Sequence, residues 1–148
     1  MVCRVKDGGR SMGLPMSYLI AYIAVLAVFG AIDAMWLSTM GPILYRPVLA
    51  EILAPNLRLA PAIAFYLMFP AGVVVFAVMP ALRSGSIFSA FMLALLFGAL
   101  AYATYDLTNY ATLRVWTLQI TILDIIYGAF ASGVASTAAF ILVRATKR

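Results

Sequence analysis

The sequence contains no histidine, only one cysteine and few charged residues. Without histidine, the chain lacks the usual imidazole base and the usual imidazole ligand of zinc or haem iron. The single Cys3 excludes a disulfide or a thiolate metal cluster within one chain. Neither glycine-rich phosphate-binding pattern, G-x-x-x-x-G-K-S/T or G-x-G-x-x-G, occurs, so nothing indicates nucleotide hydrolysis. We therefore expect no metal site and no cofactor.

Charge is scarce because apolar residues fill most of the chain. Only 10% of the 148 residues are charged, whereas 66% are apolar and the mean hydropathy is +1.06. A soluble domain has about 25% charged and about 45–50% apolar residues. The composition excludes a soluble globule, a disordered tail and a disulfide scaffold, and it predicts an integral protein of the lipid bilayer. The net charge of +5 does not indicate a nucleic-acid partner, since the basic residues lie at predicted helix ends.

Four apolar stretches are long enough to form membrane-spanning helices, each of which needs about 20 residues. Pro70 is expected to kink the second helix. Short connections favour antiparallel packing of sequential helices. The predicted fold class is an all-α integral membrane protein, an up-down bundle of four transmembrane helices. These helices are predicted at residues 16–38, 60–82, 86–107 and 115–143.

The segment before the first span, residues 1–15, is a polar leader, and residues 16–148 form a single four-helix transmembrane domain. The sequence leaves Met1, Met12 and Met16 open as the start. The apolar run after the leader is too long for the h-region of a signal peptide, so we predict a first helix that is retained.

The distribution of basic residues predicts the orientation in the cell inner (plasma) membrane. Four spans place both termini on the same side. That side carries seven basic residues and the other carries three, which predicts cytoplasmic termini because cytoplasmic loops are rich in Lys and Arg. The seven are Arg4, Lys6, Arg10, Arg83, Arg144, Lys147 and Arg148, and the three are Arg46, Arg58 and Arg114.

The first connection, residues 39–59, is long and contains Pro42, Pro47 and Pro55. Pro47 suits the first position of a helix. The residues after it place an apolar stripe opposite Glu51, which predicts a short helix in the outer membrane interface. The segment is either a loop that covers the bundle or a lid over an outward-facing site. The stripe consists of Val48, Leu49, Ile52 and Leu53.

Three aspartates, Asp33, Asp106 and Asp124, lie inside or at the edge of the predicted spans. An ionised side chain at the bilayer centre costs about 2.5–3.5 kcal/mol, so such residues need a physical reason. With a rise of about 1.5 Å per residue, Asp33 lies roughly 9 Å and Asp124 roughly 13 Å below the outer ends of their spans. Asp106 lies near the outer end of the third span and has the alternative of reaching water. All three fall in the outer half of the membrane.

Polar and aromatic residues accompany these acids at spacings of three or four, which place side chains on one helix face. We predict an outward-facing acidic and aromatic site, with Arg114 as a counter-charge. The alternatives are hydrogen bonds that hold helices together, worth about 0.6–2 kcal/mol, and aromatic residues that line the membrane interface. The candidate residues are Asp33, Trp36, Tyr66, Tyr102, Asp106, Asn109, Tyr110, Arg114, Thr121, Asp124 and Tyr127.

Two rows of small residues run along the fourth span. Such rows allow the backbones of neighbouring helices to approach closely. They predict packing inside the bundle, with a homodimer contact as the alternative. The first row is Gly128, Ser132 and Ser136, and the second is Ala129, Gly133 and Thr137.

The segments GAIDAMWL, YATYDLTNYATL and DIIYG resemble a small bacterial family of predicted membrane proteins that is catalogued as a domain of unknown function. The resemblance covers about residues 16–143. It implies a four-span membrane protein and no particular activity. It marks Asp33, Asp106, Asn109 and Asp124 as positions to test.

Three functions are compatible with these features. The first is a small carrier or permease that binds a cation, a proton or a small polar substrate at the carboxyl groups. The second is a membrane-embedded enzyme that acts on a lipid or an isoprenoid-like substrate, with aspartates as acid and base. The third is a non-catalytic accessory or assembly subunit. We rank the enzyme below the carrier because the sequence has no D-D-x-x-D motif and no histidine.

Overall fold

The computed structural model describes residues 13–147, and this part of the chain is helical apart from short connections, with no strand. Most of the polar leader, the starts Met1 and Met12, and Arg148 lie outside the described residues. Four continuous helical rods are long and apolar enough to cross a membrane, which confirms the all-α fold with four spans. The rods are Leu14–Leu49, Leu59–Ser84, Ile87–Thr112 and Leu118–Thr146.

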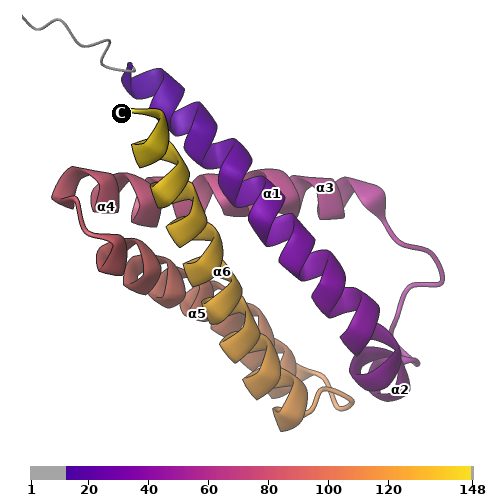
Figure 1. Cartoon of the computed structure of the whole chain (residues 1–148). Coiled ribbons are helices and arrows are strands. Elements are labelled where there is room, and N and C mark those ends of the chain that lie inside the picture. Colours follow the sequence, from indigo (N-terminus) through magenta and orange to yellow (C-terminus); the bar gives the residue numbers. More distant parts are fainter. Residues whose placement is uncertain (1–12, 148) are drawn as a thin grey trace, which may run out of the picture.

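Two of the rods are composite and two are single helices (Figure 1). The first rod consists of α1 (Leu14–Met40), η1 (Gly41–Tyr45) and α2 (Arg46–Leu49). The second consists of α3 (Leu59–Val73), η2 (Val74–Val78) and α4 (Met79–Ser84). The third and fourth rods are α5 (Ile87–Thr112) and α6 (Leu118–Thr146).

Each composite rod contains a wide π-helical turn that ends two residues before a proline, Pro47 after η1 and Pro80 after η2. Proline has no N–H group, and its ring collides with the preceding turn of a regular α-helix. The wider turn provides room, and its hydrogen bonds reach back five residues, from Arg46 to Gly41 in η1. The second rod was expected to be irregular at Pro70, but α3 continues as an α-helix beyond that residue. The irregular turn is η2, which lies just ahead of Pro80.

The short helix expected in the first connection is joined to the first span. Helix α2 follows η1 directly, and the irregular segment covers only residues 50–58. Leu49 is buried against Trp116 and Ile120. By contrast, the Ile52 and Leu53 side chains are each 47% exposed, so they do not continue a buried apolar stripe. The expected helix is therefore shorter than predicted.

Polar caps define the two tight connections between the later helices. Gly85 ends α4 with a φ of 71°, a backbone conformation that glycine adopts without strain. The Ser86 hydroxyl accepts a hydrogen bond from the Ser89 N–H and begins α5. In the same way, the Thr117 hydroxyl accepts from the Ile120 N–H at the start of α6.

Helix α6 is the central helix of the molecule. It packs closely against α5 on one side and against α1 on the other (Figure 1). Helix α1 contacts α6 more extensively than it contacts α3. Small residues of α6, such as Ala131 and Ala135, pack in the core with Val25 and Phe29 of α1. The first and last spans are therefore neighbours. The first residues of α1 and the last residues of α6 lie on the same side of the molecule (Figure 1).

Glycine makes the close contact between α5 and α6. A Cβ atom at Gly98 would collide with the carbonyl oxygen of Gly128 and with Ser132, and one at Gly128 would collide with the ring of Tyr102. A Cβ atom at Gly133 would meet the Phe91 ring, also on α5. Internal packing thus uses both small-residue rows of α6, whose members are buried except for the half-buried Thr137. A homodimer through Gly128, Ser132 and Ser136 or through Ala129, Gly133 and Thr137 stays a prediction.

Candidate functional site

The candidate residues gather at the end of the molecule that holds the connections 50–58 and 113–117, which we call the loop end. An open cavity with a volume of about 630 Å³ lies there. All four rods contribute side chains to its lining. Among the predicted site residues, it brings together Asp33, Trp36, Tyr66, Tyr102, Asp124 and Tyr127.

Asp33 is held by two tyrosines from different spans. Tyr127 of α6 donates a hydrogen bond of 2.8 Å to Oδ1, and Tyr66 of α3 donates a hydrogen bond to Oδ2. Only 6% of Asp33 is exposed. A buried polar group without a partner costs about 1–3 kcal/mol, and more when it is charged. The two hydroxyl groups therefore offset the burial of this carboxyl group and connect α1, α3 and α6.

Asp124 is connected to Trp36 through the hydroxyl group of Tyr45. This hydroxyl donates to Oδ1 of Asp124 and accepts a hydrogen bond of 2.8 Å from the indole Nε1 of Trp36. The three residues come from α6, η1 and α1. Because the indole can only donate, it directs the proton of the Tyr45 hydroxyl toward Asp124.

The two hydrogen-bonded groups are linked to each other because each helix contributes to both. Asp33 and Trp36 are three residues apart on α1, and Asp124 and Tyr127 are three residues apart on α6, so each pair shares a helix face. The Trp36 and Tyr127 rings stack with centroids 4.2 Å apart and planes inclined by 11°. As a result, Tyr127 bonds the aspartate of α1, while Trp36 reaches the aspartate of α6 through Tyr45.

The sequence did not indicate Tyr45 as a site residue. It lies nine residues after Trp36, a spacing of about two and a half turns that places side chains on opposite faces of a regular α-helix. The wide turn η1 alters that rotation and brings the two side chains together. The signal that could have located Tyr45 is the group of prolines around it, Pro42 and Pro47, which predicts an irregular turn.

Further aromatic rings complete the wall of the cavity. Tyr102 meets Tyr127 edge to face with centroids 6.0 Å apart, and Tyr105 meets Trp116 in the same manner at 5.4 Å. Trp36 and Trp116 are the two tryptophans of the chain, and both line the cavity. Trp116 and Tyr105 were not among the predicted site residues.

Asp106 is separated from the other two aspartates. It is fully buried on α5, and neither of its carboxyl oxygens has a hydrogen-bond partner among the described residues. The indole Nε1 of Trp116 is also buried and unpartnered, and it lies beside this carboxyl group without completing a hydrogen bond. Asp106 thus does not reach water at the helix end in this structure.

The remaining predicted residues lie outside the cavity lining. Thr121 is buried, and its hydroxyl donates to the backbone carbonyl of Thr117 at 3.1 Å. Asn109 is half-buried at the end of α5, and Tyr110 beside it is 46% exposed. Arg114, the expected counter-charge, is exposed in the connection 113–117.

Neutral hydroxyl groups, and not basic side chains, are the hydrogen-bond partners of Asp33 and Asp124 in the described part of the chain. Arg46 lines the cavity but is exposed at its margin. Hydroxyl dipoles stabilise a carboxylate without cancelling its charge. The aromatic faces in the same wall attract cations as well. The arrangement can therefore accommodate a positively charged group.

Residues 13–147 contain no group of three or more His, Cys, Asp or Glu side chains that could hold a metal ion. The acidic side chains in the cavity lining are those of Asp33 and Asp124.

Comparison with known proteins identifies the family of this chain. A family model described as "Predicted membrane protein (DUF2177)" matches residues 18–141. The chain belongs to this family. The DUF2177 match confirms the resemblance that the sequence segments indicated, and it includes all or most of each of the four spans. No curated protein and no solved structure matches the chain. Membership in DUF2177 shows that the chain is a membrane protein.

Proposed function

We propose that this chain is a small membrane carrier that binds a cation, or a small polar substrate bearing a positive group, in the cavity at the loop end. One observation carries the proposal. Asp33 and Asp124 line the same cavity, and the hydrogen bonds that they accept come from tyrosine hydroxyl groups. Two carboxylates without a basic partner are costly inside a membrane, and a bound cation offsets that cost.

The chemistry of the wall favours an organic cation. Aromatic rings from all four rods surround the carboxyl groups, and such rings bind ammonium groups through their faces. The Trp116 ring also lines the cavity, whereas its buried indole N–H lies beside Asp106, outside the cavity lining. Choline, a small quaternary ammonium compound, is therefore a suitable probe.

The proposed orientation follows from the basic residues. An excess of Lys and Arg at the end with both termini favours cytoplasmic termini in the inner membrane, as predicted from the sequence. The cavity then faces outward, at the end that holds the connections 50–58 and 113–117. A carrier of this length supplies one half of a pathway, so transport would require a second copy or a movement of α1 relative to α6.

A membrane-embedded enzyme acting on a lipid or an isoprenoid-like substrate is the second candidate. A cleft between α3 and α5 adjoins the cavity and favours it. An accessory subunit remains the third, since the same hydrogen bonds hold α1, α3 and α6 together. Selective binding of a cation over its neutral isostere separates the accessory subunit from the other two roles, and transport separates the carrier from the enzyme.

The test uses the two tryptophans of the cavity as reporters. The protein is placed in nanodiscs of phosphatidylethanolamine and phosphatidylglycerol, which carry no choline, and choline is titrated while tryptophan fluorescence is recorded. We expect a saturable change with choline and none with 3,3-dimethylbutan-1-ol, its uncharged isostere. Asp33→Asn and Asp124→Asn should each weaken binding about tenfold, or about 1.4 kcal/mol.

Glu51 provides the matched control. It is an exposed acid in the connection 50–58, outside the cavity lining. Glu51→Gln removes the same charge and should leave choline affinity unchanged. An equal response to choline and to the neutral isostere would overturn the proposal, as would equal losses in all three variants.

Transport is tested separately, in proteoliposomes on a solid-supported membrane. A choline concentration jump should produce a transient current that Asp33→Asn abolishes and Glu51→Gln retains. Saturable binding without any current would contradict the carrier and leave a binding protein.

A further inference from the structure

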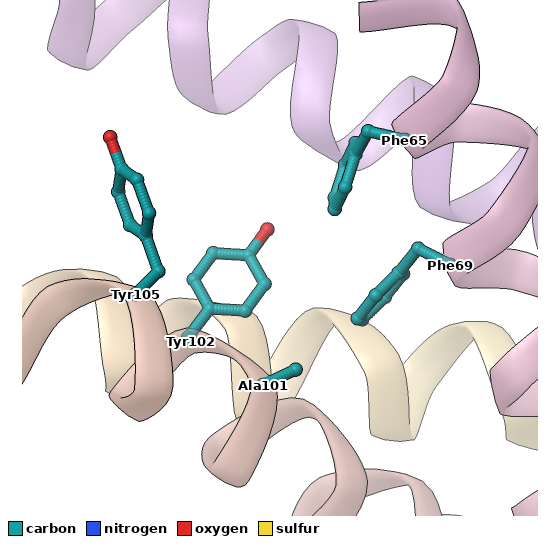
Figure 2. Close-up of a pocket in the computed structure, with 5 residues that line it drawn as sticks. All are labelled: Phe65, Phe69, Ala101, Tyr102 and Tyr105. Carbon is teal, nitrogen blue, oxygen red and sulfur yellow. The ribbon is translucent and has the colours of Figure 1, made fainter. Parts of the chain in front are cut away.

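A second hollow adjoins the cavity in the membrane-spanning part of the molecule. This cleft has a volume of about 400 Å³ and lies between α3 and α5. Figure 2 shows Phe65 and Phe69 of α3 on one side of it and Ala101, Tyr102 and Tyr105 of α5 on the other. Apart from the two tyrosine hydroxyls, these side chains are apolar. The cleft thus suits a hydrocarbon chain better than a polar group.

The cleft and the cavity adjoin each other. Phe65, Tyr102 and Tyr105 line both of them. One ligand that passes these three side chains places its polar end beside Asp33 and Asp124 and its apolar end between Phe69 and Ala101.

The cleft opens sideways, toward the region that acyl chains occupy. Phe65 is 40% exposed and Tyr105 is 58% exposed, although both belong to spans. Each lies within about two turns of the loop end of its span, so the part of its exposed surface that does not face the cavity meets acyl chains. A ligand already dissolved in the bilayer can thus enter between α3 and α5.

From this geometry we infer that the substrate is a single-chain amphiphile with a cationic head group, the head beside Asp33 and Asp124 and the alkyl chain in the cleft between α3 and α5. The inference rests on the proposed function and names its substrate class. Charge complementarity selects the head, because two carboxylates attract an ammonium group. The alkyl chain gains little from leaving one apolar surrounding for another, so the head supplies most of the affinity. The cleft must nevertheless stay open, because the chain attached to a bound head lies in it.

The experiment uses two nitroxide probes with the same head, the trimethylammonium and the hexadecyldimethylammonium derivatives of TEMPO. A nitroxide quenches tryptophan fluorescence at short range, so either probe quenches Trp36 and Trp116 when its head occupies the cavity. A neutral nitroxide with a hexadecyl chain, added at the same mole fraction of the lipid, gives the background quenching. All measurements use the full chain in nanodiscs.

Ala101→Phe fills the cleft without touching a carboxyl group. We expect it to weaken quenching by the hexadecyl probe about tenfold and to leave the short probe unchanged. Ala71→Phe is the matched control, since Ala71 is exposed on α3 outside the cleft. It should change neither. Unchanged binding of the short probe also shows that the Ala101→Phe variant is folded. If this variant does not fold, the smaller substitution Ala101→Leu takes its place.

The two proposals fail in different ways. If Asp33→Asn leaves the quenching by the short probe intact, the proposed cation site is wrong. If the short probe depends on Asp33 but Ala101→Phe and Ala71→Phe have equal effects on the hexadecyl probe, the cation site stands and the amphiphile is wrong. Equal quenching by the charged and the neutral hexadecyl probes also overturns the amphiphile.

Discussion

Trp36 of α1 lies flat against Tyr127 of α6, with ring centroids 4.2 Å apart and planes inclined by 11°. Each ring stands three residues after an aspartate on its own helix, Asp33 or Asp124. The stack therefore sets how α1 lies against α6 and, with it, how far apart the two carboxyl groups are. The geometry of the cavity therefore depends directly on how the first and last spans pack.

Two substitutions at Trp36 separate its hydrogen bond from its packing. Trp36→Phe keeps a ring on Tyr127 but removes the N–H that bonds to Tyr45, so we expect a loss of about 1–2 kcal/mol of unfolding free energy. Trp36→Ala also removes the stack and should cost about 3–5 kcal/mol. Unfolding in mixed micelles of increasing SDS content measures both. Equal losses would show that the indole hydrogen bond accounts for the whole contribution.

Cation binding should weaken as the pH falls. A protonated cavity carboxyl group no longer attracts an ammonium group, whereas choline keeps its charge at every pH. Choline affinity in nanodiscs should therefore decrease on acidification, by up to about tenfold per lost carboxylate. The double variant Asp33→Asn, Asp124→Asn should bind weakly with no dependence on pH. A pH dependence that persists in this variant would assign the titration to another group.

The sequence predicts the spans well because membrane insertion depends mainly on length and hydropathy. Four helical rods appear where four apolar runs were found, although α5 continues to Thr112, beyond the predicted end of its span. The pairing of Asp33 with Trp36 and of Asp124 with Tyr127 on one helix face also follows from helical spacing alone. These features depend on local sequence, which a single chain displays directly.

Features that depend on contacts between distant residues could not be predicted. Nothing in the sequence indicates that Tyr66 and Tyr127 both bond to Asp33, since this requires the relative positions of three helices. Asp106 was expected near the outer end of its span, with the alternative of reaching water, yet it is fully buried, whereas the other two acids line the cavity. Its rotation about the helix axis decides the difference, and hydropathy carries no information about that rotation.

Two glycine substitutions test the close packing of α6. Gly128→Ala places a methyl group in the ring of Tyr102 and should destabilise the protein by about 1–3 kcal/mol. Gly30→Ala on α1 meets no atom within 4 Å, and alanine favours the helix, so it should stabilise the protein by up to about 1 kcal/mol. Thermal melts followed by circular dichroism in one detergent compare the two. A similar shift for both would contradict the contact of Tyr102 with Gly128.

The aspartates should differ in what they contribute to stability. Asp33 accepts two hydroxyl hydrogen bonds, so Asp33→Asn disturbs both and should lower the unfolding free energy by about 1–3 kcal/mol. Both carboxyl oxygens of Asp106 are buried without a partner among the described residues, and Asp106→Asn removes no hydrogen bond there. It also replaces an ionisable group by a neutral one of the same shape, which costs less to bury. We therefore expect Asp106→Asn to leave stability unchanged or to raise it, in the same melts. A loss as large as that of Asp33→Asn would mean that Asp106 has a partner, such as a buried water, whose bonds the amide cannot replace.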